Sequence, residues 1–144
     1  MIPQRNLSLL SNRLAKSGGR LIPEAVLERD YCLAWFLVAL SQETLGLRLA
    51  FKGGTAIKRC YVGDYRFSED LDFTLTQEAP FETIRRGLDC VFVRLQSASG
   101  IVFRYLREDR YSHANSHTFY LGYDGPLPAT AAGRDVKVDI TIRE

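Results

Sequence analysis

Cysteine, net charge and long apolar runs are all scarce in this sequence of 144 residues. Its three cysteines, Cys32, Cys60 and Cys90, are odd in number and far apart, which argues against a disulfide framework or a metal cluster and favours reduced, buried thiols. The formal net charge of +2 is too small to indicate a nucleic-acid partner by itself. No stretch reaches about 18 uncharged apolar residues, and the first twenty residues lack the apolar core of a signal peptide. We therefore expect a soluble, cytoplasmic protein with no membrane partner.

What the sequence does contain is typical of one globular domain. Hydrophobic residues make up 46% and charged residues 25%, which is enough to bury a core. We expect an N-terminal arm over 1–20 and a core domain over 21–144. Periodicity and turn residues predict helices over 23–46, 55–61 and 79–98, the last interrupted at Gly87, and strands over 47–51, 66–76, 101–108, 117–123 and 136–142. The expected fold is α+β, with a mixed or antiparallel sheet of about five strands and helices packed on one face.

Two of the expected strands carry carboxylates on their polar side. In "YRFSEDLDFTL", Asp70 and Asp72 point to the face opposite Leu71 and Phe73, and Asp139 has the equivalent place in "VKVDITI". If the two strands are neighbours, each carboxylate pair costs about 3 kcal/mol at about 5 Å and an effective dielectric of about 20. Magnesium, or manganese, would neutralise this charge, because both prefer hard oxygen ligands. The alternative is that these are ordinary solvent-facing residues of a half-exposed sheet.

A glycine pair precedes the acidic strand. In "FKGGTAIKRCY", Gly53 and Gly54 allow a close approach of the backbone, and a helix starting at Thr55 would offer free amide groups to an anion. A phosphate would fit this turn, although a tight strand-to-helix turn also needs glycine for its geometry alone. The segment is not a Walker loop, because no G-x-x-x-x-G-K-[ST] occurs.

Taken together, "LAFKGGTAIKRCY" and "RFSEDLDF" resemble the AbiEii/AbiGii-type nucleotidyltransferase toxin family, a branch of the DNA polymerase β-like nucleotidyltransferase superfamily. "VLERDYCLAWFLVAL" also looks like the leading helix of that family, so the resemblance spans residues 24 to 76 closely and extends loosely to "VKVDI". It implies a nucleotidyltransferase-like fold. It also implies that Gly53, Gly54 and Thr55 hold the triphosphate, and that Asp70 and Asp72 bind metal together with a third carboxylate, Asp139.

Three further residues match the family less specifically. Arg66 and Ser68 stand where the family has R-x-S before the acidic pair, and Lys58 lies where a cation would reach phosphate from the short helix. Each of the three residues has a simpler interpretation as a solvated side chain. The family usually continues into a helical half after the third carboxylate, which this sequence lacks because it stops at "TIRE", so it is either a fragment or a minimal version.

The reaction implied by the resemblance is transfer of a nucleoside monophosphate from a nucleoside triphosphate to an acceptor hydroxyl. The implied acceptor is RNA, with the 3′ end of transfer RNA as the expected target, and the implied partner of such a toxin is an antitoxin protein. Two alternatives remain open: a domain that modifies a protein or a small molecule with the same residues, and a non-catalytic binding module.

Basic and aromatic residues of the second half offer a further RNA-binding hypothesis. An RNA-facing surface could be formed by six arginines, although a solvated face is the more ordinary use: Arg85, Arg86, Arg94, Arg104, Arg107 and Arg110. The aromatic residues Tyr105, Tyr111, Phe119 and Tyr120 could stack bases, with core packing as the alternative. His113 and His117 have a spacing that would bind zinc on a helix, but their Asn and Ser neighbours predict a turn.

Overall fold

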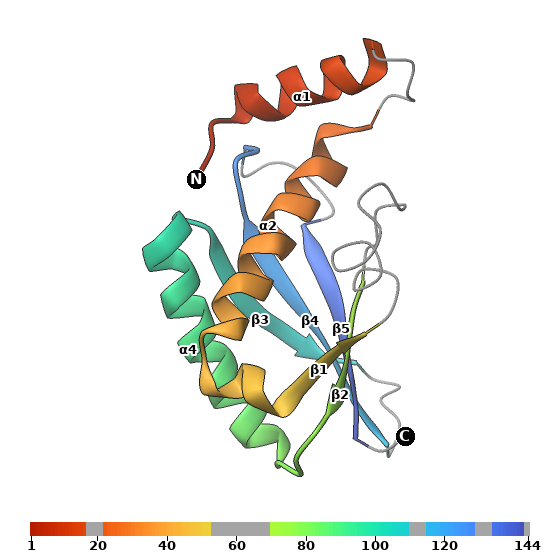
Figure 1. Cartoon of the computed structure of the whole chain (residues 1–144), viewed down its shortest axis with the longest axis vertical. Coiled ribbons are helices and arrows are strands. Elements are labelled where there is room, and N and C mark those ends of the chain that lie inside the picture. The colour runs from red at the N-terminus through yellow and green to blue at the C-terminus, as the bar shows by residue number, and fades with distance from the viewer. Residues whose placement is uncertain (17–21, 53–69, 110–114, 129–133, 143–144) are drawn as a thin grey trace.

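The computed structural model describes residues 1–16, 22–52, 70–109, 115–128 and 134–142 (Figure 1). Within these ranges the elements follow one another as α1 (Gln4–Lys16), α2 (Glu24–Ser41), the 3₁₀ helix η1 (Thr44–Arg48), β1 (Leu49–Lys52), β2 (Asp70–Leu75), α4 (Phe81–Ser99), β3 (Val102–Glu108), β4 (Ser116–Asp124) and β5 (Asp135–Thr141). In this part of the chain, no helix has the length and apolar character needed to cross a membrane.

The five described strands form one sheet in the order β1-β2-β5-β4-β3. β2 and β5 are parallel, whereas β1 with β2, β4 with β5 and β3 with β4 are antiparallel. The α2 and α4 helices lie together over one face of this sheet (Figure 1). The predicted α+β fold, a mixed sheet of five strands with helices on one face, is confirmed.

The helix-covered face of the sheet holds the core. α4 is amphipathic, and its buried residues recur at helical spacing along one side: Ile84, Leu88, Val91 and Leu95. β2 and β5 bury every second residue against the helices, as in β5, where Val136, Val138 and Ile140 alternate with half-buried residues. Polar residues of β2 and β5 therefore lie on the face away from α2 and α4.

Two predictions about the helices were wrong. The helix over 79–98 is not interrupted at Gly87, since α4 runs unbroken through it and a β-carbon there would lie 2.9 Å from the β-carbon of Leu45. The glycine therefore allows α4 and η1 to approach closely. The first helix ends at Ser41 rather than at Gly46, where a β-carbon would lie 2.2 Å from the Leu40 carbonyl oxygen.

The expectation of buried thiols was right for one cysteine and wrong for another. Cys32 is fully buried in α2, whereas Cys90 is exposed because it lies on the outer side of α4, between the buried positions of the amphipathic pattern. Cys60 lies outside the described residues.

Residues of the expected N-terminal arm form α1, which packs against α2. Leu7 of α1 is buried beside Leu27 of α2 and Leu127, and the Ser11 hydroxyl donates a hydrogen bond of 2.6 Å to the Ile22 carbonyl oxygen. A domain boundary at residue 20 stays a prediction.

A buried ion pair fixes the start of β5 to α2. The Arg134 Nε donates to Glu28 Oε1 at 3.0 Å, and the Leu127 backbone N–H donates to Glu28 Oε2 at 2.6 Å. Both charged side chains are at least nine-tenths buried, with exposed fractions of 8% for Arg134 and 1% for Glu28. Because Arg134 immediately precedes β5, this pair anchors the strand that carries Asp139.

Candidate functional site

The three carboxylates predicted from the strand patterns share the open face of the sheet. Asp72 of β2 and Asp139 of β5 are direct partners in the parallel ladder. Asp70 pairs with Lys137, two residues earlier along the same two strands. Side chains of directly paired residues point to the same face, and neighbouring strands lie about 4.8 Å apart. The fold therefore brings the carboxylates of Asp72 and Asp139 side by side, with Asp70 next along the same face.

The electrostatics agree with this crowding. The pKa of Asp72 is raised above its usual value of 3.8, first by burial of its carboxyl group and then by the negative charges of Asp139 and Asp70. The positive charges of Lys52 and Lys137 lower the same pKa and offset part of the shift. A divalent cation bound between the carboxylates would relieve the repulsion that the two lysines leave.

Neighbouring strands contribute hydroxyl and ammonium groups that the sequence analysis missed. The Thr118 hydroxyl of β4 donates a hydrogen bond to Asp139 Oδ1. Lys52, the ladder partner of Asp72 on β1, donates from Nζ to the Thr141 hydroxyl oxygen at 3.1 Å, so its side chain reaches across β2 to β5. Two signals were available in the sequence: Lys52 directly precedes the double glycine, and Thr141 lies on the same side of its strand as Asp139.

The remaining predicted site residues lie between β1 and β2, outside the described residues. These are Gly53, Gly54, Thr55, Lys58, Arg66 and Ser68. Their expected roles in holding the triphosphate stay predictions. β1 ends at Lys52, the ladder partner of Asp72, and the segment follows it directly in the sequence.

The comparison with protein families is decisive. Residues 35–144 match the family described as "Nucleotidyl transferase AbiEii toxin, Type IV TA system", from the middle of α2 to the end of the sequence. The chain belongs to the AbiEii family. This confirms the resemblance seen in the sequence, and the matched region includes all three carboxylates.

Among solved structures, the chain is similar to one entitled "Crystal structure of JHP933 from Helicobacter pylori", with a TM-score of 0.54 and 20% sequence identity. The similarity covers 85% of this chain and 46% of that chain, so this chain spans just under half the length of its structural neighbour. At this level of identity the likeness shows the fold alone. No match was found among curated proteins.

The carboxylates of this AbiEii chain fit a divalent cation as far as their donor chemistry goes. Among the described residues, no three acidic, histidine or cysteine side chains converge closely enough to enclose one ion. Magnesium does not require such a cage, because it is commonly held by one or two carboxylates together with waters and substrate phosphates. The paired oxygens of Asp72 and Asp139 suit that mode of binding.

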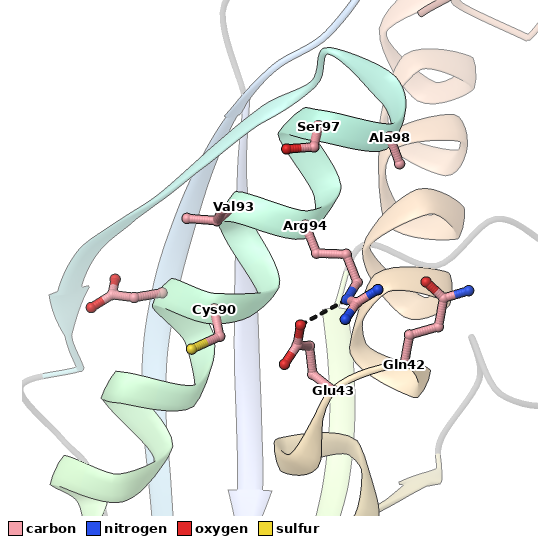
Figure 2. Close-up of a pocket in the computed structure, with 8 residues that line it drawn as sticks. Gln42, Glu43, Cys90, Val93, Arg94, Ser97 and Ala98 are labelled. Atoms are coloured by element: carbon pink, nitrogen blue, oxygen red, sulfur yellow. Dashed lines mark hydrogen bonds and ion pairs between the residues drawn. The ribbon is translucent and has the colours of Figure 1, made fainter.

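A separate hollow of about 730 Å³ lies on the outer side of α4 and the end of α2 (Figure 2). An ion pair of 2.7 Å between Arg94 Nε and Glu43 Oε1 crosses it, and Cys90 and Val93 line the side formed by α4. The buried side of α4 and the sheet separate this hollow from the carboxylates. The hollow therefore does not take part in the carboxylate site.

The structure also separates the aromatic residues considered for base stacking. Tyr105 and Phe119 lie on the helix-covered face, with ring centroids 5.7 Å apart, and serve core packing. Tyr120 lies on the carboxylate face, because it pairs with Lys137, whereas Tyr111 falls outside the described residues. His117 is part of β4, where its ring centroid lies 5.2 Å from that of Phe81, and burial lowers the pKa of its imidazole.

Several of the basic residues proposed as an RNA-facing surface are in surface ion pairs. Arg85 pairs with Asp89, and Arg86 with Glu82, both along α4. This arrangement is typical of a solvated helix face. Of the arginines of β3, Arg104 pairs with Asp124 at 2.9 Å, whereas Arg107 lies over the ring of Tyr120.

Proposed function

We propose that this chain transfers a nucleoside monophosphate from a nucleoside triphosphate to an acceptor hydroxyl, with the 3′ end of a transfer RNA as acceptor, as the toxin of a toxin–antitoxin pair. The observation that carries the proposal is the direct pairing of Asp72 and Asp139 across parallel β2 and β5, in a chain of the AbiEii family. Nucleoside triphosphates and transfer RNA share the cytoplasm, where we expect the protein and its antitoxin to reside.

Asp72 and Asp139 would hold a divalent cation, magnesium or manganese, with Asp70 next to them on the same face. When bound, such a cation would neutralise charge on the phosphates and on the attacking oxygen. The chain would contribute mainly positioning, as is usual for transfer to phosphorus. An acceptor oxygen forms a bond to the α-phosphorus while the bond from that phosphorus to the bridging oxygen breaks, and pyrophosphate leaves.

Individual side chains have distinct proposed roles in this step. The hydrogen bond from Thr118 orients the Asp139 carboxylate through Oδ1, which leaves Oδ2 to accept the proton of the attacking hydroxyl. Lys52 carries a positive charge beside Asp72, where the triphosphate would approach. The expected triphosphate ligands are Gly53, Gly54, Thr55, Lys58, Arg66 and Ser68.

The test is label transfer from nucleoside triphosphates carrying ³²P at the α-phosphate, incubated with the chain and total cellular RNA, with magnesium or with a chelator. Asp72→Asn and Asp139→Asn should each lower transfer at least a hundredfold, whereas Asp89→Asn on α4 serves as the matched control and should not. Subsequent ribonuclease or protease treatment identifies the acceptor. Transfer that survives both substitutions would contradict the proposal, and label removed only by protease would indicate a protein acceptor instead.

A further inference from the structure

A row of side chains runs across the open face of the sheet, displaced by two residues along β2 and β5 from Asp72 and Asp139. Ladder pairing links Arg107 of β3 to Tyr120 of β4, Tyr120 to Lys137 of β5, and Lys137 to Asp70 of β2. Directly paired residues share a face, so these four side chains form one line perpendicular to the strands. The line ends at the acidic pair of β2.

Tyr120 is held in a defined orientation within this row. The Arg107 guanidinium carbon lies 4.3 Å from the centroid of its ring, and its hydroxyl donates to Asp109 Oδ2 at 3.3 Å. Tyr120 is half-buried and Arg107 is exposed, so the stacked pair borders solvent. Proteins stack unpaired bases on aromatic rings and on arginine guanidinium planes, and this pair offers both kinds of surface next to solvent.

The position of this ring distinguishes it from the other aromatic residues of the sheet. Phe73, Phe103, Tyr105, Phe119 and Tyr123 all lie on the helix-covered side, where they belong to the core or pack against it. Tyr120 instead lies among charged and polar neighbours, with Lys137 beside it and Thr118 two residues before it. Core packing therefore does not account for its placement.

We propose that Tyr120 and Arg107 form a nucleobase-stacking subsite of the carboxylate centre. This inference rests on the proposed nucleotidyl transfer, because it names where one base of the reacting nucleotides is held. Asp139 is the diagonal neighbour of Tyr120 on the adjacent strand, two residues beyond its ladder partner Lys137, and such neighbours are about 7 to 8 Å apart. That separation is comparable with the length of one nucleoside, so a base stacked at Tyr120 places its sugar or phosphate at the carboxylates.

The first experiment measures binding of RNA to the full 144-residue chain by fluorescence anisotropy. One fluorescein-labelled RNA has an unpaired 3′ end, and a matched RNA has abasic sugars at its last two positions, which keeps the phosphate charge unchanged. Wild type should bind the first RNA more tightly. Tyr120→Leu should weaken binding of that RNA roughly tenfold and leave the abasic RNA unaffected, as expected for the loss of one stacked base.

A second arm distinguishes the two sources of the base. Calorimetric titration compares each of the four nucleoside triphosphates with inorganic tripolyphosphate, which has no base, in the presence of magnesium. If Tyr120→Leu weakens binding of the base-bearing RNA alone, the subsite belongs to the acceptor. If it weakens binding of a nucleoside triphosphate alone, the subsite belongs to the donor. Unchanged binding of both ligand types would overturn the proposal.

The control is Tyr105→Leu, because Tyr105 also carries an arginine over its ring, with the Arg85 guanidinium carbon 4.5 Å from the centroid, but on the helix-covered side. An equal loss of base-dependent binding in Tyr105→Leu would overturn the proposal, and so would an equal loss of abasic binding in Tyr120→Leu. Tyr120→Phe retains the ring and should recover most of the lost binding. If thermal melting shows that Tyr120→Leu is unfolded, the exposed substitution Arg107→Met replaces it in the comparison of base-bearing with abasic RNA. Loss of base-dependent binding in Arg107→Met would then support the subsite, and unchanged binding would overturn it.

These measurements remain separate from the test of the reaction itself. If Asp72→Asn abolishes transfer while Tyr120→Leu binds base-bearing and abasic ligands as wild type does, the stacking subsite is wrong and the proposed function stands. If transfer is unaffected by the loss of Asp72 but Tyr120→Leu loses base-dependent binding, the stacking surface stands and the reaction is wrong.

Discussion

Replacing Asp72 by asparagine should stabilise the metal-free protein, although it should abolish the proposed reaction. Asp72 and Asp139 are ladder partners on adjacent strands, and neighbouring strands are about 5 Å apart. Two carboxylates at that separation repel by about 1 to 3 kcal/mol for effective dielectrics between about 80 and about 20. Asp72 is partly exposed to solvent, and Lys52 and Lys137 offset some of the repulsion. We therefore expect Asp72→Asn to raise the free energy of unfolding by about 1 kcal/mol, near the lower end of this range of repulsion energies.

The measurement is thermal and urea unfolding at low salt with a chelator, followed by repetition with magnesium. The variant should melt roughly 3 °C above wild type in chelator. Magnesium should raise the melting temperature of wild type, because a ligand that binds only the folded state stabilises it, and should raise that of the variant less. The difference between the two proteins should therefore shrink or reverse when the cation is present.

The pH dependence supplies a second check on the same reasoning. The pKa of Asp72 in the folded state is raised above its usual value of 3.8, so the folded state binds the proton more tightly than the unfolded chain does. The destabilisation caused by Asp72 is complete above the raised pKa, declines as the pH falls through it, and is absent below the unfolded value. The advantage of the variant should vanish in the same acidic window.

The matched control is Asp89→Asn, which removes an exposed carboxylate that pairs with Arg85 along α4 at 2.5 Å. This change should lower stability slightly, by about 0 to 1 kcal/mol, so its sign is opposite to that of Asp72→Asn. A metal-free Asp72→Asn protein that is less stable than wild type at neutral pH would refute the argument, and so would an advantage that persists undiminished in acid.

Four further predictions concern the cysteines and the contacts of α2 with Arg134 and Gly125. Glu28→Ala should lower the free energy of unfolding by about 3 to 5 kcal/mol, because it leaves Arg134 buried without its carboxylate, and Arg134→Met in the same chain should restore part of the loss in urea unfolding. Burial raises the pKa of the Cys32 thiol from 9.0 to about 12, so at pH 8 iodoacetamide should label Cys90 far faster in peptide mass spectrometry. The same shift should make stability fall between pH 9.0 and about 12, where the unfolded thiol loses its proton first, and Cys32→Ala should make this slope shallower. Tyr123 should keep part of the slope, because burial raises its pKa from 10.0 to about 12. Gly125→Ala should destabilise by about 1 to 3 kcal/mol, since its β-carbon would lie 2.7 Å from the Cys32 sulfur, and unchanged melting would contradict this packing.

Local patterns in the sequence were sufficient to predict most elements and the polar face of the key strands. Strict alternation around Asp72 and Asp139 places their side chains opposite the apolar residues, and β2 and β5 keep that alternation. The errors at Gly87 and Cys90 have one origin, since both depend on which side of α4 meets its neighbours. The sequence gives the helical period, but the contact with η1 that requires a glycine exists only after the chain has folded.

The neighbour relationship between β2 and β5 is the part of the site that local patterns could not predict. α4, β3 and β4 intervene in the chain, and β5 then enters the sheet between β2 and β4 rather than at an edge. No turn residue or spacing specifies such a distant parallel pairing. The carboxylates themselves provided only a conditional argument: if the strands met, the repulsion would need a cation. Because the fold accepts that repulsion at a central strand pair, where a neutral residue would be more stable, the free energy cost itself favours a functional reason for retaining both Asp72 and Asp139.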